Sequence, residues 1–220
     1  MKPNKQLIPF CGYPILKVNT GELLNAAELK FLKGLDTHEN AVDPWEDSVQ
    51  KPFRLTDGVN ILDNVELRRV KDFIWSNFCD YTDEVLQIEN QFYMCNSWAT
   101  FQKQGAFHPS HHHTNAVYSM VYYVEADEAF LEFSTALARI QEGFNFSYNV
   151  KNYNVFNSRA WKVSVKTGDM IIFPGILKHG SIVHQSDTNR IIIAASFFMN
   201  GEIGNDWNYN LINITDANDR

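Results

Sequence analysis

The histidines between residues 108 and 179 have the spacing of metal ligands. Four of them fall within six residues, at His108, His111, His112 and His113, and His179 follows much later. In an extended segment alternate side chains share a face, so His111 and His113 point together while His112 points away. Neutral imidazole is a good ligand for Fe, Zn, Cu and Ni. A histidine pair on a strand is more often structural, but this clustering predicts a metal held by His111, His113 and His179.

Arg190 is a candidate for binding an anion near that metal. It opens the run Ile191–Met199, which begins with apolar residues on both faces and is expected to be a central, buried strand. A fixed cation is costly there unless it meets an anion, and a planar guanidinium suits a carboxylate. Two interpretations remain open: Arg190 binds a ligand carboxylate, or it lies outside the interior and pairs with Asp187 or Asp169.

The composition is that of a single folded domain spanning residues 1–220. Hydrophobic residues make up 45% of the chain and aromatic residues 14%, so a substantial core is available and disorder is not expected. The net charge of -7 and the absence of a basic stripe argue against nucleic acid as a partner.

Cysteine usage and hydropathy predict a soluble, intracellular protein of the cytoplasm. An odd number of scattered cysteines fits a reducing compartment better than a disulfide scaffold. They are Cys11, Cys79 and Cys95. Pro9 and Gly12 interrupt the apolar segment that a signal peptide would need. The longest apolar stretch, Ile191–Met199, is too short to span a bilayer, so no membrane partner is expected.

Helices are expected in the first part of the chain and strands in the second. Asn25 can cap a helix over 26–35, and apolar residues at three-to-four spacing predict a longer helix over 65–78. Short runs rich in Val, Ile, Tyr and Phe follow, which is typical of an antiparallel sandwich or barrel. These strands are expected at 91–95, 98–101, 118–124, 130–133, 161–165, 169–173 and 190–199.

This pattern predicts a mainly β fold, a jelly-roll barrel buttressed by N-terminal α-helices. Residues 1–90 are expected to form a helical and mixed support layer, irregular over 33–62 after a short strand at 13–18. Residues 91–200 are expected to form the jelly-roll core, with a long loop over 134–160. A C-terminal tail follows at 201–220.

The second half of the chain also resembles a known family. It carries, in order, His111-His-His113, Ser119-Met-Val-Tyr122-Tyr123, the strand Gly168 to Pro174, His179 and Arg190. This order resembles that of the Fe(II)- and 2-oxoglutarate-dependent oxygenases, especially their uncharacterised branch with a His-x-His motif. The similarity covers roughly residues 90 to 200.

The resemblance implies a double-stranded β-helix with a cupin-like barrel, and Fe(II) and 2-oxoglutarate as cofactors. His111 then corresponds to the first metal ligand, His113 to the ligand two residues on, and His179 to the distal ligand. Arg190 corresponds to the residue that binds the distal carboxylate of 2-oxoglutarate. The implied reaction consumes O2 and 2-oxoglutarate, releases succinate and CO2, and hydroxylates a C–H bond.

Two positions depart from the family's pattern. His113 stands where most members have Asp or Glu, which leaves either an all-histidine triad or a two-histidine site completed by water. Ile192 stands where many relatives have a Ser or Thr that helps the arginine hold the co-substrate. A hydroxyl from a neighbouring strand is then expected to take that part. The candidates are Tyr122, Tyr118, Tyr93 and Ser119, of which Tyr122 and Ser119 are preferred as cofactor-binding residues.

Other residues near the motifs have weaker indications. Asn96 precedes the histidine cluster on a predicted strand and is a candidate for contact with the co-substrate, whereas its neighbour Trp98 is more often a core residue. His108 and His184 are expected beside the ligands or at the surface, with His108 as an alternative ligand to His113. Asp169 is expected to be a turn residue without a catalytic role.

The predicted function is therefore a dioxygenase that hydroxylates a small-molecule or peptide substrate, and exposed sheet edges favour a homodimer. A cupin-type metalloenzyme is the first alternative, although the acid expected after His-x-His is missing from 114–124 and such an enzyme has no need for Arg190. The second alternative is a non-catalytic jelly roll with a structural metal, for which His108 would complete four ligands.

Overall fold

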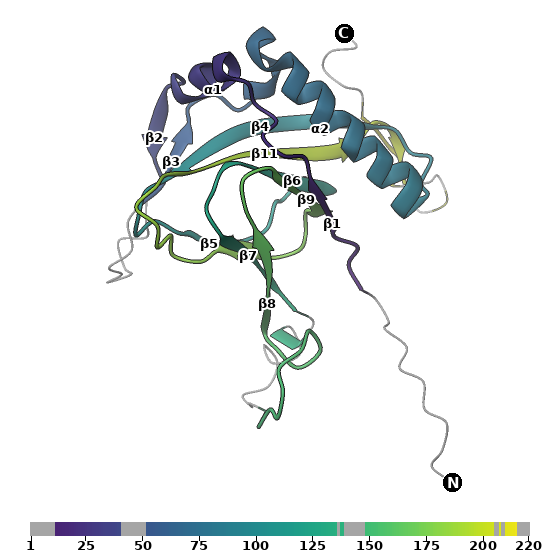
Figure 1. The fold of residues 1–220 in the computed structure, drawn as a ribbon. Coiled ribbons are helices and arrows are strands. Elements are labelled where there is room, and N and C mark those ends of the chain that lie inside the picture. The colour runs from purple at the N-terminus through teal and green to yellow at the C-terminus, as the bar shows by residue number, and fades with distance from the viewer. Residues whose placement is uncertain are drawn as a thin grey trace.

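Two β-sheets face each other in the computed structural model, which describes residues 12–40, 52–135, 137–138, 148–204, 207 and 210–214 (Figure 1). The larger sheet has the order β1-β9-β6-β11-β4-β3-β2 and the smaller the order β5-β10-β7-β8. The strands of the larger sheet are β1 (Leu16–Asn19), β2 (Thr37–Glu39), β3 (Arg54–Thr56), β4 (Phe92–Gln102), β6 (Tyr118–Glu125), β9 (Asp169–Pro174) and β11 (Arg190–Met199). Those of the smaller sheet are β5 (His108–His111), β7 (Ala129–Ser134), β8 (Ala160–Val165) and β10 (His179–Ser181).

The larger sheet is apolar on both faces because it separates two cores. On β11, Ile191 and Ile193 point into the core beneath the helices, whereas Ile192 packs against the core between the two sheets. β11 lies between β4 and β6 and pairs antiparallel with both. The prediction of a central, buried strand opened by Arg190 is therefore correct, and it places the guanidinium inside the fold.

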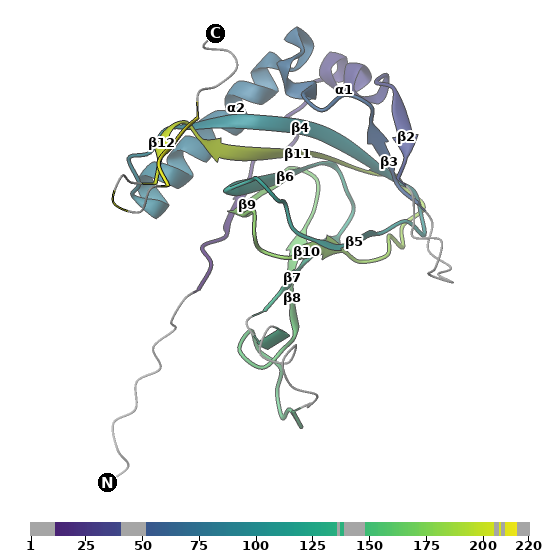
Figure 2. The same cartoon turned by 180° about the vertical axis from the view of Figure 1, so that it is seen from behind.

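The helices cover the outer face of the larger sheet, as Figures 1 and 2 show. α1 (Ala26–Lys33) begins at the predicted cap Asn25, whose side chain accepts from the backbone N–H groups of Ala27 and Glu28. The longer helix starts as a 3-10 turn, Val65–Leu67, continues as α2 (Arg68–Asp80), and ends in a π-helical turn, Tyr81–Leu86. One face of α2 packs on the sheet through Val70, Ile74 and Phe78. A mainly β jelly roll buttressed by N-terminal helices is thus confirmed.

Several boundaries differ from the prediction. The two strands expected at 91–95 and 98–101 are one strand, β4, because no turn interrupts its pairing with β11 apart from a bulge near Ser196. The segment expected to be irregular contains β2 and β3, which pair with each other and extend the sheet beyond β4. β1 begins later than expected and adds to the opposite edge, against β9. The support layer thus shares the larger sheet with the barrel.

The C-terminal tail contains a small hairpin, β12 (Gly201–Ile203) paired with β13 (Ile212–Ile214). Cys11, much of the loop predicted over 134–160 and the last six residues lie outside the described part of the chain. Within that part, every helix is too short or too polar to cross a membrane.

Candidate metal centre

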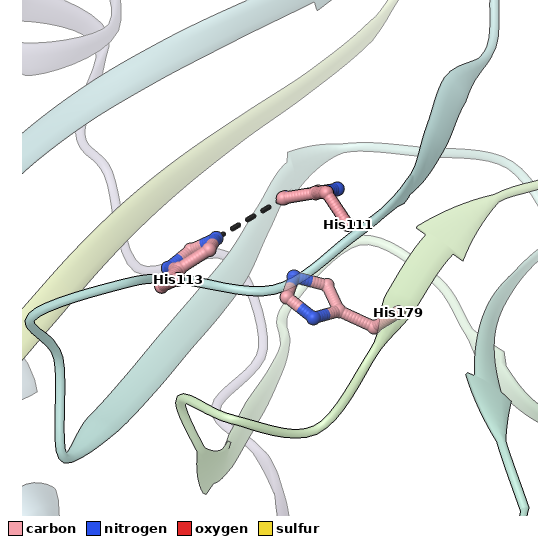
Figure 3. A group of neighbouring side chains, drawn as sticks. All are labelled: His111, His113 and His179. Carbon is pink, nitrogen blue, oxygen red and sulfur yellow. Dashed lines mark hydrogen bonds between the residues drawn. The ribbon is translucent and has the colours of Figure 1, made fainter. Parts of the chain in front are cut away.

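Three histidines from two neighbouring strands converge between the sheets. β5 ends at His111, His113 follows two residues later, and β10 begins at His179 (Figure 3). β5 and β10 are antiparallel partners, with His111 opposite His179 in the register. One ring nitrogen from each histidine lies within 4.8 Å of the others, a spacing that could hold one metal ion. The structure therefore brings together the three predicted ligands.

Contacts at Nδ1 leave the Nε2 atom of each ring available as a ligand. His111 Nδ1 lies 2.8 Å from the carbonyl oxygen of Pro109, and His179 Nδ1 lies 2.9 Å from that of Leu177. A carbonyl only accepts, so both Nδ1 atoms are the protonated ones and each Nε2 carries a lone pair. These backbone contacts fix the tautomer and the ring orientation in the way that supporting groups do for metal-bound histidines.

His113 is held by two serine hydroxyls instead of a carbonyl. Its Nδ1 lies 2.8 Å from Ser119 Oγ and 3.3 Å from Ser196 Oγ. Ser119 on β6 and Ser196 on β11 are opposite each other in the register, and both are buried. His113 Nε2 then points at His111 Nε2 across 3.2 Å, a contact drawn in Figure 3. A bound cation would relieve the repulsion of two lone pairs at that distance.

The histidines of the cluster stay neutral at physiological pH, as metal ligands must. Burial is the main cause: it lowers the pKa of His179 to about 3 and that of His113 to about 4, with a further contribution from neighbouring His111. Burial also lowers the pKa of His111. Neutral imidazoles are the form that binds a divalent metal.

Arg190 lies beside the histidines with only neutral partners. It is 2% exposed. Its Nε donates to Gln102 Oε1 at 2.5 Å, and its Nη2 donates to Ser181 Oγ at 3.1 Å and to the carbonyl of Ile182 at 3.3 Å. Asp169, one suggested partner, instead forms an ion pair with Lys17 at 2.9 Å. Burial lowers the pKa of Arg190, the direction expected for a cation that lacks an anion.

A pocket between the sheets contains both the histidines and the arginine. Its lining residues come from β4, β5, β6, β7, β10 and β11 and the turn after β5. They are Trp98, Thr100, Gln102, His108, His111, His113, Val121, Tyr123, Leu131, His179, Gly180, Ser181, Arg190, Ile192 and Ala194. No acid is found among these described residues. Thr100 is 1% exposed and its Oγ1 has no hydrogen-bond partner, so it is available to a ligand.

These observations fit a divalent metal together with an anionic co-substrate. Three neutral imidazoles offer nitrogen donors and leave further metal positions open. The buried cation of Arg190 calls for an anion, and the orphaned hydroxyl of Thr100 calls for a polar ligand group. A ligand with carboxylate and keto oxygens would fill the open metal positions, pair with Arg190 and bond to the hydroxyl of Thr100.

The predicted cofactor-binding residues other than Arg190 occupy different places. Ser119 contacts His113, not Arg190. Tyr122 points to the opposite face of the sheet, where its hydroxyl contacts the backbone of Leu23 at 2.9 Å. Asn96 is on the same face of β4 as Trp98 and Thr100, and its Oδ1 is buried without a partner, but it does not line the pocket. Tyr93 and Tyr118 do not line it either.

Sequence reasoning missed the hydroxyl groups that do flank Ile192. In the register of the sheet, Ile192 lies opposite Thr100 on β4 and opposite Tyr123 on β6, and both line the pocket. The period-two alternation of β4 was the available signal, because Trp98, Thr100 and Gln102 share one face. The register across to β11 could not be obtained without the structure.

The other histidines and Trp98 lie near the three candidate ligands but are not among them. His108 stacks on Phe53 with ring centroids 4.4 Å apart and leans on His111 at 4.2 Å, outside the group of three converging ligands. His112 is exposed, as predicted. His184 is buried and its Nε2 lies 2.7 Å from the carbonyl of Thr188. Trp98 lines the pocket and lies 5.4 Å from the ring of His113, between centroids.

The part of the chain that carries these residues is similar to a known family. Residues 96–196 match a family model described as "Putative 2OG-Fe(II) oxygenase". The family match therefore covers the strands that carry the histidines and Arg190. Comparison with curated proteins finds none whose sequence matches the chain.

Solved structures with a similar fold include an oxidoreductase, an epimerase and a prolyl hydroxylase. An oxidoreductase of the 2OG-Fe(II) oxygenase family from Burkholderia pseudomallei has a TM-score of 0.58 at 7% identity, over 83% of this chain and 84% of its own. The α-ketoglutarate-dependent epimerase SnoN from nogalamycin biosynthesis has 0.56 at 10%, over 83% and 78%. A prolyl-4-hydroxylase from Pseudomonas putida has 0.52 at 12%, over 84% and 92%. At these identities the likeness establishes the fold.

Proposed function

We propose that the chain, which matches the 2OG-Fe(II) oxygenase family model over residues 96–196, is a dioxygenase that uses Fe(II) and 2-oxoglutarate and hydroxylates a small-molecule or peptide substrate. One observation carries the proposal: three convergent neutral histidines and a buried arginine without an anion share one pocket. The metal would be held by His111, His113 and His179.

When bound, the cofactors supply the oxidation, in which O2 and 2-oxoglutarate yield succinate, CO2 and one oxygen atom for the substrate. The protein's own residues bind, orient and exclude water. Arg190 is proposed to bind the distal carboxylate, held in place by Gln102 and Ser181. Thr100 and Tyr123 are proposed to supply the hydroxyl contacts that Ile192 cannot make.

The walls of the pocket favour chemistry protected from bulk water. Its lining combines the polar groups above with Trp98, Val121, Leu131 and Ile192. An apolar environment strengthens the attraction between Arg190 and a carboxylate, because fewer waters compete for either group. Trp98, next to His113, is placed to contact a substrate near the metal.

Proteins with a similar fold act on different kinds of substrate. SnoN has been solved with Fe3+, α-ketoglutarate and nogalamycin RO, and the Pseudomonas putida protein is a prolyl-4-hydroxylase. The same fold therefore serves small-molecule and prolyl substrates, and both epimerisation and hydroxylation. We propose hydroxylation here, which product mass spectrometry distinguishes by a gain of one oxygen.

Arg190→Ala tests the co-substrate assignment. Loss of one partner of a buried charge pair should weaken 2-oxoglutarate binding by about 2–5 kcal/mol. The measurements are calorimetric titration and succinate formation by the Fe(II)-loaded protein in air. Arg54→Ala, which removes an exposed arginine on β3, is the control. Unchanged 2-oxoglutarate affinity in Arg190→Ala would remove Arg190 from the site, and absence of succinate from the wild-type protein would overturn the dioxygenase assignment.

A further inference from the structure

The charges of the pocket do not balance when the proposed cofactors are bound. A divalent metal and the guanidinium of Arg190 carry three positive charges, whereas 2-oxoglutarate carries two negative ones. A metal-bound imidazole is neutral, so His111, His113 and His179 as ligands contribute no charge. One positive charge therefore remains in a site with little water.

Nothing on the surrounding described strands offsets that charge. None of the pocket-lining residues is an acid. The ionisable groups that act electrostatically on His113 and His179 are other histidines, and the one that acts on Arg190 is Tyr123. The acids on β6, β7 and β9 are already paired with lysines: Glu125 with Lys33, Glu132 with Lys162 and Asp169 with Lys17. Uncompensated charge in a low-dielectric site is costly.

We propose that this centre binds one monoanion in addition to 2-oxoglutarate, either a free inorganic anion or a carboxylate of the substrate. The inference rests on the proposed function, and it follows from one residue, His113. A carboxylate ligand at position 113 would neutralise the centre, whereas an imidazole leaves it positive. The serine contacts of His113 show that its ring is built into the site and is not a surface group.

Azide is a suitable probe, because it is a monoanion that binds metals and absorbs in complex with them. The Fe(II)-loaded protein with saturating 2-oxoglutarate is titrated anaerobically with azide, and the shift of the visible charge-transfer band is followed. The wild-type protein is expected to bind azide at least about tenfold more tightly than His113→Asp, since one unit charge at contact distance is worth that much or more at a partly buried site.

Nitric oxide is the matched neutral probe and should bind both proteins with similar affinity, because it responds to an open metal position and not to charge. Equal azide affinity in the two proteins would overturn the proposal. A charge-transfer band that never forms with 2-oxoglutarate would instead overturn the proposed function, so the two failures are distinguishable.

A second variant covers the case in which His113→Asp does not retain the metal. Ser119→Asp keeps all three imidazoles and places a carboxylate against Nδ1 of His113. It should also weaken azide binding by at least about tenfold, and unchanged azide affinity in this variant would contradict the proposal. Competition experiments then distinguish the two candidates for the bound monoanion. Displacement of azide by chloride but not by acetate indicates a free inorganic anion. Displacement by acetate but not by chloride indicates a carboxylate of the substrate.

Discussion

At the scale of single residues, the groups that hydrogen-bond to the histidine rings position the metal site together with the histidines themselves. The hydroxyls of Ser119 and Ser196 bind Nδ1 of His113, the ring nitrogen that faces away from the proposed metal, and so hold an imidazole at the position where the family resemblance implies a carboxylate. The motif could be read from the sequence, but this support could not, since Ser196 lies on a strand far away in the chain.

Ser119→Ala should lower metal affinity by about tenfold to a hundredfold, the usual effect of losing a group that orients a ligand. Competition with a metal-binding dye measures it. Ser164→Ala, at an exposed position on β8, should leave affinity unchanged. In a His113→Asp background the effect of Ser119→Ala should shrink, because no ring remains to be oriented. A full effect in that background would show that Ser119 acts on the fold and not through His113.

Thr100→Val should separate binding from stability. Removing a buried hydroxyl that has no partner should leave the free energy of unfolding unchanged or raise it by up to about 1 kcal/mol. Affinity for 2-oxoglutarate should fall by about tenfold, the value of one hydrogen bond to a charged group. Thr56→Val is the contrast, because the Thr56 hydroxyl accepts from Ala99 and donates to Gly58; it should destabilise the protein and spare co-substrate affinity. Loss of stability in Thr100→Val would contradict this account.

At the scale of elements, the close approach of β5 and β10 sets the distance between His111 and His179. A Cβ at Gly180 would lie 2.8 Å from the carbonyl oxygen of His108 and 3.1 Å from Ser110, so only glycine fits. Long periodic elements such as α2 and β11 were predictable from the sequence. Three-residue strands such as β10 were not, because they exist through their pairing and carry no periodicity of their own.

Gly180→Ala should push β5 away from β10 and weaken the metal site. We expect metal affinity to fall together with the unfolding midpoint, because the added methyl group meets backbone that cannot move aside. Gly58→Ala is the control, since its nearest neighbour would be 4.0 Å from the new Cβ. Isothermal titration with Co(II) and urea denaturation report the two effects. Unchanged metal affinity in Gly180→Ala would show that the strand spacing does not position the ligands.

At the scale of the whole molecule, the neutral cluster links stability to pH. The folded protein holds His113 and His179 neutral down to pKa values of about 4 and 3, whereas the unfolded chain takes up these protons near 6.5. Between those values the unfolded state binds more protons, so the metal-free protein should lose stability as pH falls from about 6.5 towards 4. Each histidine contributes at most about 1.4 kcal/mol per pH unit. Urea midpoints at pH 7.5, 6 and 5 check this, and His179→Gln should reduce the slope.

The most direct test of the central claim is an anaerobic titration of the Fe(II)-loaded protein with 2-oxoglutarate, followed by visible absorption. A charge-transfer band should appear in the wild-type protein and be absent from His179→Ala, because the band requires a metal chelated by the co-substrate at this triad. A protein that binds Fe(II) but never develops the band, or a His179→Ala variant that keeps it, would contradict the assignment of the pocket as a 2-oxoglutarate-dependent metal centre.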